Sequence, residues 1–144
     1  EGDMINLSAP VGGFSIENTE RPQLFIGSGV GMTPLVSMFK KAASLNVPTQ
    51  MIQAVVTEDE RPFAQKLDSI TDNYEQAQLH LHVKDKEGYL EAKELEQYLS
   101  EQPEIYICGG TKFLHSIINS LKELNYDMNH VHFETFIPRL SVQV

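Results

Sequence analysis

The sequence predicts an α/β fold in which a parallel sheet of five strands carries helices on both faces. Apolar runs of strand length alternate along the chain with segments whose apolar residues recur every three or four positions. This alternation implies parallel strands that are joined by crossover helices. Such sheets bind their ligands beyond the carboxyl ends of the strands, near the point where the strand order reverses. A functional site is therefore expected at that edge.

Five segments of the chain have the length and composition of strands. They are Gln23–Ile26, Gln50–Val56, Gln78–Val83, Glu104–Ile107 and His130–Glu134. Four segments between them have helical spacing, as the apolar positions Phe113, Ile117 and Leu121 illustrate. These predicted helices span Pro34–Leu45, Phe63–Asn73, Glu91–Leu99 and Lys112–Leu124.

The beginning of the chain does not follow this alternation. Met4–Ala9 alternates like a strand of a sheet that is exposed on one face. We interpret residues 1–16 as the end of a separate β domain, residues 17–22 as a polar linker and residues 23–144 as the α/β domain. Because the chain begins without a methionine, we expect it to be part of a longer protein.

Length and composition limit the class of protein. A chain of 144 residues suits one domain with a sizeable core. Its net charge of −9 argues against nucleic acid or an anionic membrane as the main partner. No apolar run is long enough to cross a bilayer, and no secretory leader is recognisable. The single cysteine rules out an internal disulfide and fits a reducing compartment, so a cytoplasmic location is expected.

The most informative segment is the glycine-rich stretch after the first predicted strand. Gly27, Gly29 and Gly31 allow the backbone to turn sharply and to approach a ligand closely. Thr33 is expected to cap the next helix, and Pro34 suits its first turn. The unpaired N–H groups at such a helix start suit a diphosphate, so a nucleotide is the first ligand to consider. The standard dinucleotide fingerprint is not matched, and a turn that merely needs glycine remains an alternative.

A second glycine turn follows the fourth predicted strand. It consists of Cys108, Gly109 and Gly110, and Thr111 is expected to cap the helix that begins at Lys112. Both turns follow strands and can therefore face one ligand. Cys108 can lie against a flat cofactor ring, or it can be a buried, unreactive thiol. A nucleophilic role is less supported, because no histidine or carboxylate adjoins it in the sequence.

Acidic and aromatic residues follow two other predicted strands. An acid within Thr57–Glu60 can accept a hydrogen bond from a ribose hydroxyl and repel an additional phosphate, which favours NADH over NADPH. Arg61 keeps NADPH open, and a solvated loop is the plainer interpretation. After the last strand, Phe136 can stack on a ring system while Glu134 sets the charge beside it. A core aromatic and a surface acid are the alternatives there.

Two histidine pairs raise the question of a metal site. His80 and His82 alternate on one predicted strand and share a face, as do His130 and His132 on another. Neither pair has a linked cysteine or carboxylate motif. We interpret these residues as part of the sheet surface and predict no metal site.

Taken together, four segments resemble the reductase half of the flavohemoglobins, the nitric oxide dioxygenases within the ferredoxin–NADP reductase superfamily. The segments are Gly2-Asp3 with Ala9–Phe14, then Gly27–Pro34, Ile107–Phe113 and His132–Pro138. They occur in the family's order and extend from end to end of the chain. The ending Ile137–Val142 is similar to that of a staphylococcal-type member.

The resemblance implies a five-stranded, Rossmann-like domain that binds a nicotinamide nucleotide and follows a flavin-binding barrel and a haem globin. Gly2–Phe14 matches the last strand of that barrel. The family's nucleotide loop matches Gly29, Val30, Gly31, Met32, Thr33 and Pro34, and its nicotinamide-side turn matches Cys108, Gly109 and Gly110 with Phe113 behind them. Glu134 matches the residue that tunes the flavin and haem potentials. The flavin-contacting tail matches Thr135, Phe136, Ile137 and Pro138.

By the family's mechanism, NADH or NADPH passes a hydride to FAD, and electrons then reach haem b, where dioxygen converts nitric oxide to nitrate. This chain alone is expected to lack that activity and to bind FAD poorly. It departs from the family at Gly110, where many relatives have proline, and at Val56–Asp59, so the adenosine contacts do not transfer. The nucleotide domain of another flavin reductase, or a nucleotide-sensing module without a redox role, remains an alternative.

Overall fold

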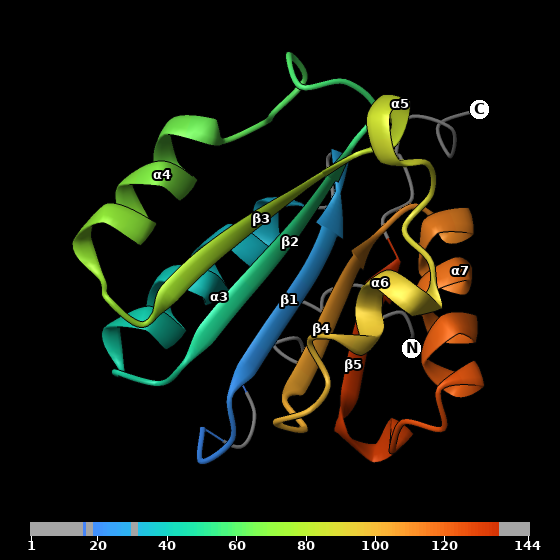
Figure 1. Ribbon diagram of the computed structural model, residues 1–144. Coiled ribbons are helices and arrows are strands. Elements are labelled where there is room, and N and C mark those ends of the chain that lie inside the picture. Colours follow the sequence, from blue (N-terminus) through green and yellow to red (C-terminus); the bar gives the residue numbers. More distant parts are fainter. Residues whose placement is uncertain (1–15, 17–18, 30–31, 136–144) are drawn as a thin grey trace, which may run out of the picture.

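The sheet consists of five parallel strands in the order β3-β2-β1-β4-β5 (Figure 1). The computed structural model describes residue 16, residues 19–29 and residues 32–135. The strands are β1 (Gln23–Ser28), β2 (Thr49–Val55), β3 (Ala77–Val83), β4 (Glu104–Gly109) and β5 (Val131–Thr135). Each coincides with a predicted strand and differs from it only near its ends. The predicted parallel α/β fold is therefore confirmed.

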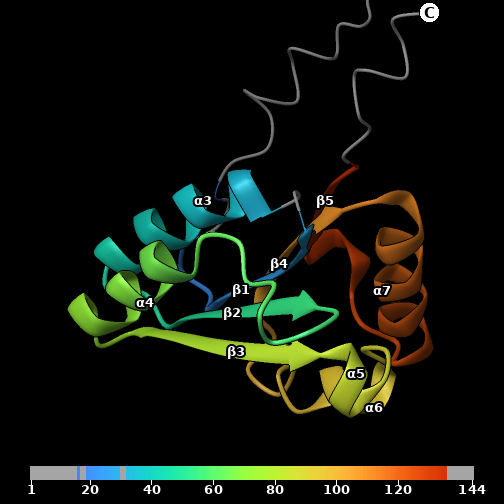
Figure 2. The ribbon, with the colours of Figure 1, turned by 90° about the horizontal axis from the view of Figure 1, so that it is seen from above.

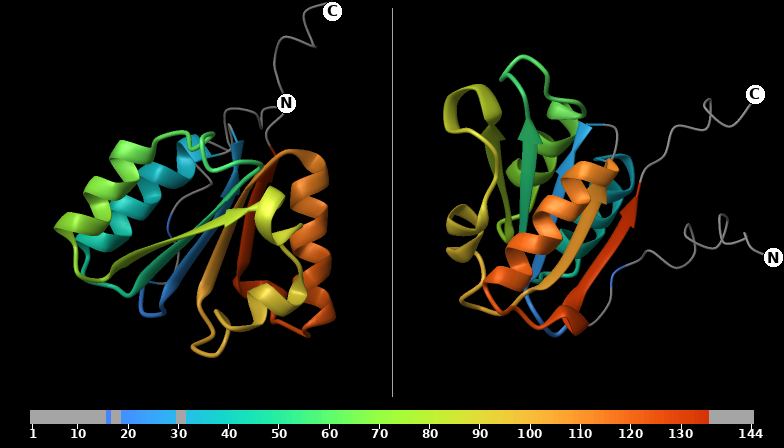
Figure 3. Two further views of the ribbon diagram at one scale, coloured as in Figure 1. Left: turned by 45° about the horizontal axis from the view of Figure 1, so that its top comes forward. Right: turned by 90° about the vertical axis from the view of Figure 1, so that its right-hand side faces the viewer.

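Helices cover both faces of the sheet, as Figures 2 and 3 show. One face carries α3 (Met32–Ser44) and α4 (Ala64–Asn73), and the other carries α6 (Ala92–Glu96) and α7 (Thr111–Glu123). The short helix α5 (Lys84–Glu87) and the 3₁₀ turn η2 (Met128–His130) were not predicted, because they are too short to show a period. The predicted helix Glu91–Leu99 was too long, since only the five residues of α6 are helical there.

The strands supply two separate cores because successive side chains point to opposite faces of the sheet. On the α3 side, Phe25 stacks on Tyr106 with ring centroids 5.0 Å apart, and Phe39 of α3 packs edge-on against Phe25. On the α7 side, Ile26 and Ile107 pack against the helix, with Leu114, Ile117 and Leu121 facing the sheet. These cores fix the strand ends that form the functional edge.

Both predicted helix caps at this edge were wrong. Thr33 is the second residue of α3 rather than its cap. At α7 the cap position is Gly110, whose backbone is extended, and Thr111 is already helical. No side chain accepts a hydrogen bond at the Gly110 cap. The first N–H groups of α7 are therefore available to a ligand at the edge.

Within the described ranges, none of the helices has the length and hydropathy that a membrane span requires.

Candidate functional site

The site begins with a row of three residues that the sheet register brings together. Gly27 of β1 pairs with Cys108 of β4, and Cys108 pairs with Glu134 of β5. Each of these residues is the next to last of its strand, and the three strands are neighbours in the sheet although the chain separates them widely. The expectation that both glycine turns and the end of β5 share one edge is therefore confirmed.

Two of the glycines in the first turn serve different purposes. A Cβ atom at Gly27 would lie 2.6 Å from Leu35 and 2.7 Å from Met32, so Gly27 allows α3 to pack closely on β1. This packing role of Gly27 was not anticipated from the sequence. Gly29 has a φ of +51°, a conformation that glycine adopts readily, and it turns the chain at the end of β1. Met32 is fully buried, so it can offer a ligand only its backbone.

The second turn approaches the first one closely. A Cβ atom at Gly109 would lie 2.7 Å from Phe113 and 2.8 Å from the hydroxyl of Ser28, so only glycine fits between them. At Gly110, by contrast, a Cβ atom would meet nothing within 4 Å. The space in front of the α7 N-terminus is therefore open at Gly110.

Cys108 and Glu134 are neighbours on the α3 side of the sheet, and burial affects both. Cys108 is 2% exposed. Burial, reinforced by the nearby Glu134 carboxylate, raises the pKa of the Cys108 thiol to about 11. Burial also raises the pKa of Glu134. At neutral pH the thiol is thus protonated, which does not suit a nucleophile.

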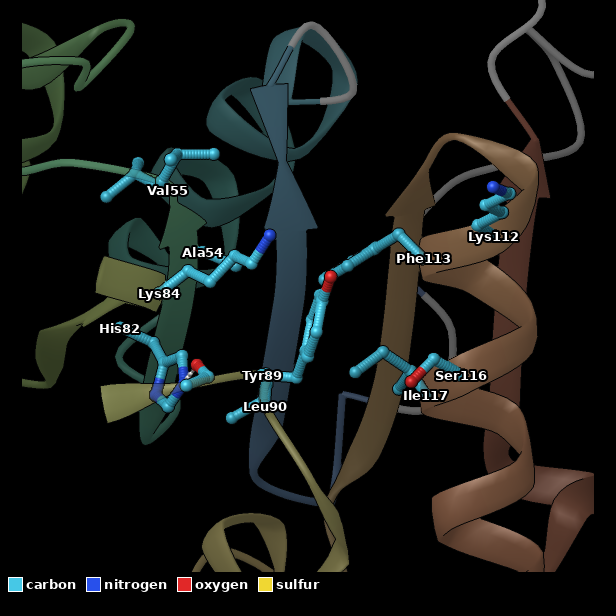
Figure 4. A pocket seen from close by; sticks show the side chains of 12 residues that line it. Ala54, Val55, His82, Lys84, Tyr89, Leu90, Lys112, Phe113, Ser116 and Ile117 are labelled. Atoms are coloured by element: carbon cyan, nitrogen blue, oxygen red, sulfur yellow. Dashed lines mark hydrogen bonds between the residues drawn. The ribbon is translucent and has the colours of Figure 1, made fainter. Parts of the chain in front are cut away.

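A cavity of about 470 Å³ opens between the ends of β2 and β3 and helix α7 (Figure 4). Its lining is mostly apolar and includes Val55, Leu90, Phe113 and Ile117. Lysine side chains come from two sides of the cavity, Lys84 from α5 and Lys112 from α7. An apolar cavity with a few positive charges is suited to a ligand that combines an aromatic ring with phosphate groups.

Tyr89 forms one wall of this cavity, and sequence analysis did not single it out. Its side chain is 67% exposed, and the Lys84 ammonium lies 4.5 Å from the centre of its ring. A hydrogen bond with Lys84 lowers the pKa of the phenol. The sequence feature that could have drawn attention to Tyr89 is the Gly88-Tyr89 pair, which follows β3 and so lies near the carboxyl edge of the sheet. That position was hidden because the unpredicted helix α5 intervenes.

A second hollow adjoins the end of β2, where the acidic loop was expected to meet a ribose. It is bordered by Gly29, Asp59, Glu60 and Arg61. Glu58 does not line it and forms an ion pair with Lys86. The guanidinium of Arg61 lies 3.1 Å from Asp68. The charges that the sequence assigned to nucleotide choice are thus partly neutralised within the protein.

The histidines do not form a metal centre. His130 belongs to η2 rather than to a strand, and its Nδ1 lies 3.0 Å from the Glu104 carboxylate. His132 Nε2 lies 2.6 Å from the other oxygen of Glu104. His80 bonds to Gln50 with 2.8 Å between the atoms. Among the described residues, no group of three potential ligands is arranged to hold a metal ion.

Several predicted site residues lie outside the described residues. These are Val30, Gly31, Phe136, Ile137 and Pro138, together with the side chain of Thr135. The same holds for nearly all of the predicted barrel remnant at residues 1–16.

Residues 25–118 match the family model described as the oxidoreductase NAD-binding domain. The chain belongs to this family. The edge described above, with its two glycine turns and its cavity, belongs to an NAD-binding domain of this family. The resemblance that the sequence motifs indicated is confirmed at this level.

Relatives of this NAD-binding domain include several flavohemoproteins. Flavohemoprotein B of Dictyostelium discoideum is 28% identical over 98% of the chain, and a flavohemoprotein of Bacillus cereus is 29% identical over 99%. The chain spans only 37% and 40% of their respective lengths.

Solved structures show the same fold. The flavohem-like FAD/NAD binding domain of a nitric oxide dioxygenase from Vibrio cholerae superposes with a TM-score of 0.75 at 25% identity, covering 87% of this chain and 54% of that one. The flavohemoglobin of Malassezia yamatoensis, with bound FAD and haem, gives a TM-score of 0.74 at 19% identity. This superposition covers 94% of the present chain and 35% of the flavohemoglobin chain.

Proposed function

We propose that this chain is the nicotinamide-nucleotide-binding part of a flavohemoprotein, and that it holds NADH or NADPH against FAD. The observation that carries the proposal is the row Gly27–Cys108–Glu134, which places both glycine turns and the end of β5 at one edge. The flavohemoprotein relatives over nearly the whole chain support the wider assignment. In the whole protein, this chain would hold a nucleotide that can supply a hydride to FAD, and FAD and haem would supply the redox chemistry by which dioxygen converts nitric oxide to nitrate.

The residues present fit a dinucleotide. The uncapped start of α7 and the Gly29 turn offer backbone N–H groups for phosphates, and the absence of a Cβ atom at Gly110 leaves space beside them. The apolar cavity beside Tyr89 fits an adenine ring, and Lys84 with Lys112 supplies positive charge. The chain's contribution is thus position and charge rather than acid–base chemistry.

The flavin side of the proposal rests on the end of β5. Glu134 keeps a partly buried carboxyl group beside Cys108, where its charge state affects any ring system held there. Thr135, Phe136, Ile137 and Pro138 are proposed to contact FAD, and residues 1–16 are proposed to be the last part of its barrel. We also propose a cytoplasmic location, which the single buried thiol supports.

A titration of the chain with NADH and NADPH tests the nucleotide part. Replacing Tyr89 with alanine should weaken NADH binding about tenfold, because stacking of a base on an aromatic ring contributes roughly 1–3 kcal/mol. Leu45→Ser is the matched control, since Leu45 is also exposed but follows the far end of α3. Binding is measured by nicotinamide fluorescence.

The same titration tests nucleotide choice. We propose NADH as the preferred nucleotide, with NADPH within about tenfold of it, because acidic Asp59 and Glu60 oppose the two cavity lysines. Tighter binding of NADPH would overturn this preference. Equal binding of NADH by wild type and Tyr89→Ala would remove the cavity from the site.

A further inference from the structure

His82 is a buried polar residue that the proposed function does not use. It lies near the end of β3, is 7% exposed and lines the cavity beside α7. Its Nε2 lies 2.8 Å from the carbonyl oxygen of Gly88, as the dashed line in Figure 4 marks. Because a carbonyl oxygen can only accept, the ring nitrogen that faces it must carry a hydrogen. His82 is therefore the Nε2–H tautomer or is doubly protonated.

Gly88 has a backbone conformation that residues other than glycine rarely adopt. Its φ of 78° and ψ of −168° fall in a region that almost only glycine adopts. The N–H of Gly88 donates to Lys84 at 2.8 Å, while His82 donates to its carbonyl oxygen. Both backbone polar groups of Gly88 are thus hydrogen-bonded, the N–H to Lys84 of α5 and the carbonyl oxygen to His82 of β3.

Helix α5, which leads into this turn, cannot hold it alone. The helix has only four residues, and so short a helix is not stable by itself. Glu87 ties it to the sheet, since its carboxylate accepts a hydrogen bond of 3.0 Å from the N–H of Val83. The other carboxylate oxygen of Glu87 lies 3.7 Å from Nδ1 of His82. His82 consequently lies against both Glu87, the last residue of α5, and Gly88, the residue that follows it.

Tyr89 depends on this turn for its direction. Its ring is 67% exposed, so the core does not fix it, whereas the next residue, Leu90, is buried at 6%. The position of the ring over the cavity therefore follows from the backbone at Gly88 and from the contact with Lys84.

We propose that His82 is a positioning residue for the adenine side of the nucleotide site. Through its hydrogen bond to Gly88, it orients Tyr89 as a wall against which a purine ring stacks. This inference rests on the proposed function, because it concerns the same cavity. It assigns His82 no contact with the reacting nicotinamide.

The test compares His82→Leu with His82→Gln in the same chain. Leucine fills a similar volume but has no donor, whereas the glutamine amide nitrogen can take the place of Nε2. With 5′-AMP as the probe, His82→Leu should bind about tenfold more weakly, and His82→Gln should return to within about threefold of wild type. Reduced nicotinamide mononucleotide, which lacks the adenosine half, should bind all three proteins equally.

Two further measurements separate positioning from a loss of stability. In a Tyr89→Ala background, His82→Leu should cause no additional loss of 5′-AMP affinity, because its effect passes through Tyr89. Long-range proton–nitrogen spectra of the wild type should show a hydrogen on Nε2 of His82. The melting temperature of each variant is measured alongside.

The outcomes are distinct. If wild type binds 5′-AMP and His82→Leu binds it equally well, the inference is wrong while the proposed function stands. Equal loss of both probes, or a neutral His82 that carries its hydrogen on Nδ1 instead, also overturns the inference. If wild type binds neither NADH nor 5′-AMP, the proposed function fails and the inference fails with it.

Discussion

The two ends of the sheet treat their polar groups in opposite ways. At the amino-terminal end, the carboxylate of Glu104 is 3% exposed and meets Arg21 at 3.4 Å as well as His130 and His132. At the carboxyl end, helix α7 begins without a side-chain cap, Gly110 faces open space and Tyr89 is exposed. We call the amino-terminal end the closed end, because its charged side chains pair with each other. We call the carboxyl end the open end, because it leaves backbone N–H donors and the Tyr89 ring for a ligand. Histidines alone therefore do not mark the functional end.

The largest expected effect concerns the closed end. Glu104→Gln should lower the free energy of unfolding by about 3 kcal/mol, because removing one partner of a buried charge cluster leaves the others uncompensated. Arg21 and both histidines would lose the Glu104 carboxylate, and His130 would keep only its contact with Asp127 at 3.7 Å. Urea unfolding measures the loss, and NADH affinity of the folded variant should not change. A change in NADH affinity larger than about threefold would break the comparison between the two ends.

A pair of glycine variants sharpens the description of the open end. Gly109→Ala should cost about 2 kcal/mol of stability, since the new methyl group would overlap Phe113 and Ser28. Gly110→Ala should leave stability within about 0.5 kcal/mol and NADH affinity within about threefold, because its methyl group would meet no atom within 4 Å. Thermal unfolding and NADH titration of both variants decide the matter. A larger loss of NADH affinity in Gly110→Ala would show that the nucleotide packs directly against this turn.

The flavin side is tested in the full-length protein by stopped-flow measurement of flavin reduction. Glu134→Ala and Phe136→Ala should each slow hydride transfer about tenfold, because both are proposed to lie beside the flavin ring. The flavin potential is measured in parallel. Unchanged rates and an unchanged potential in both variants would exclude these residues from the site.

The smallest effect concerns Cys108, which belongs to the row of Gly27, Cys108 and Glu134 at the open end but is itself buried. The pKa of its thiol is raised to about 11 in the folded chain. At a pH above the ordinary thiol pKa, the unfolded chain therefore loses this proton while the folded chain still holds it. Stability should thus fall between about pH 9 and pH 11, by about 1 kcal/mol at pH 10. Comparison of wild type with Cys108→Ala isolates this slope. Identical pH profiles would show that the thiol is more accessible than its burial indicates.

The strands could be predicted from the sequence because each is a segment of strand length in which apolar residues that supply the two cores recur. The glycine turns were also recognisable, since Gly29 and Gly109 occupy positions that other residues fit poorly. The helix caps were not, because the turn before α7 places Gly110 where Thr111 was expected. Local sequence does not reveal how many residues a turn uses.

The cavity was beyond sequence analysis for another reason. Its walls come from β2, the segment after β3 and helix α7, which meet only in the folded chain. The acidic loop after β2 attracted attention instead, although Glu58 is paired with Lys86. Similarly, His80 and His82 lie two residues apart on β3 and look alike in the sequence, yet His82 bonds to Gly88 whereas His80 bonds to Gln50.

The central place of β1 also has a consequence for how the protein folds. Gln23 pairs with Thr49 of the next strand and with Glu104, which follows much later in the chain. Pairing across a longer loop costs more chain entropy, so we expect the β1–β2–β3 half to form before β4 and β5 dock. The row of Gly27, Cys108 and Glu134 would then be completed last. During synthesis, a nascent chain would acquire its ligand-binding edge only after the final strand has left the ribosome.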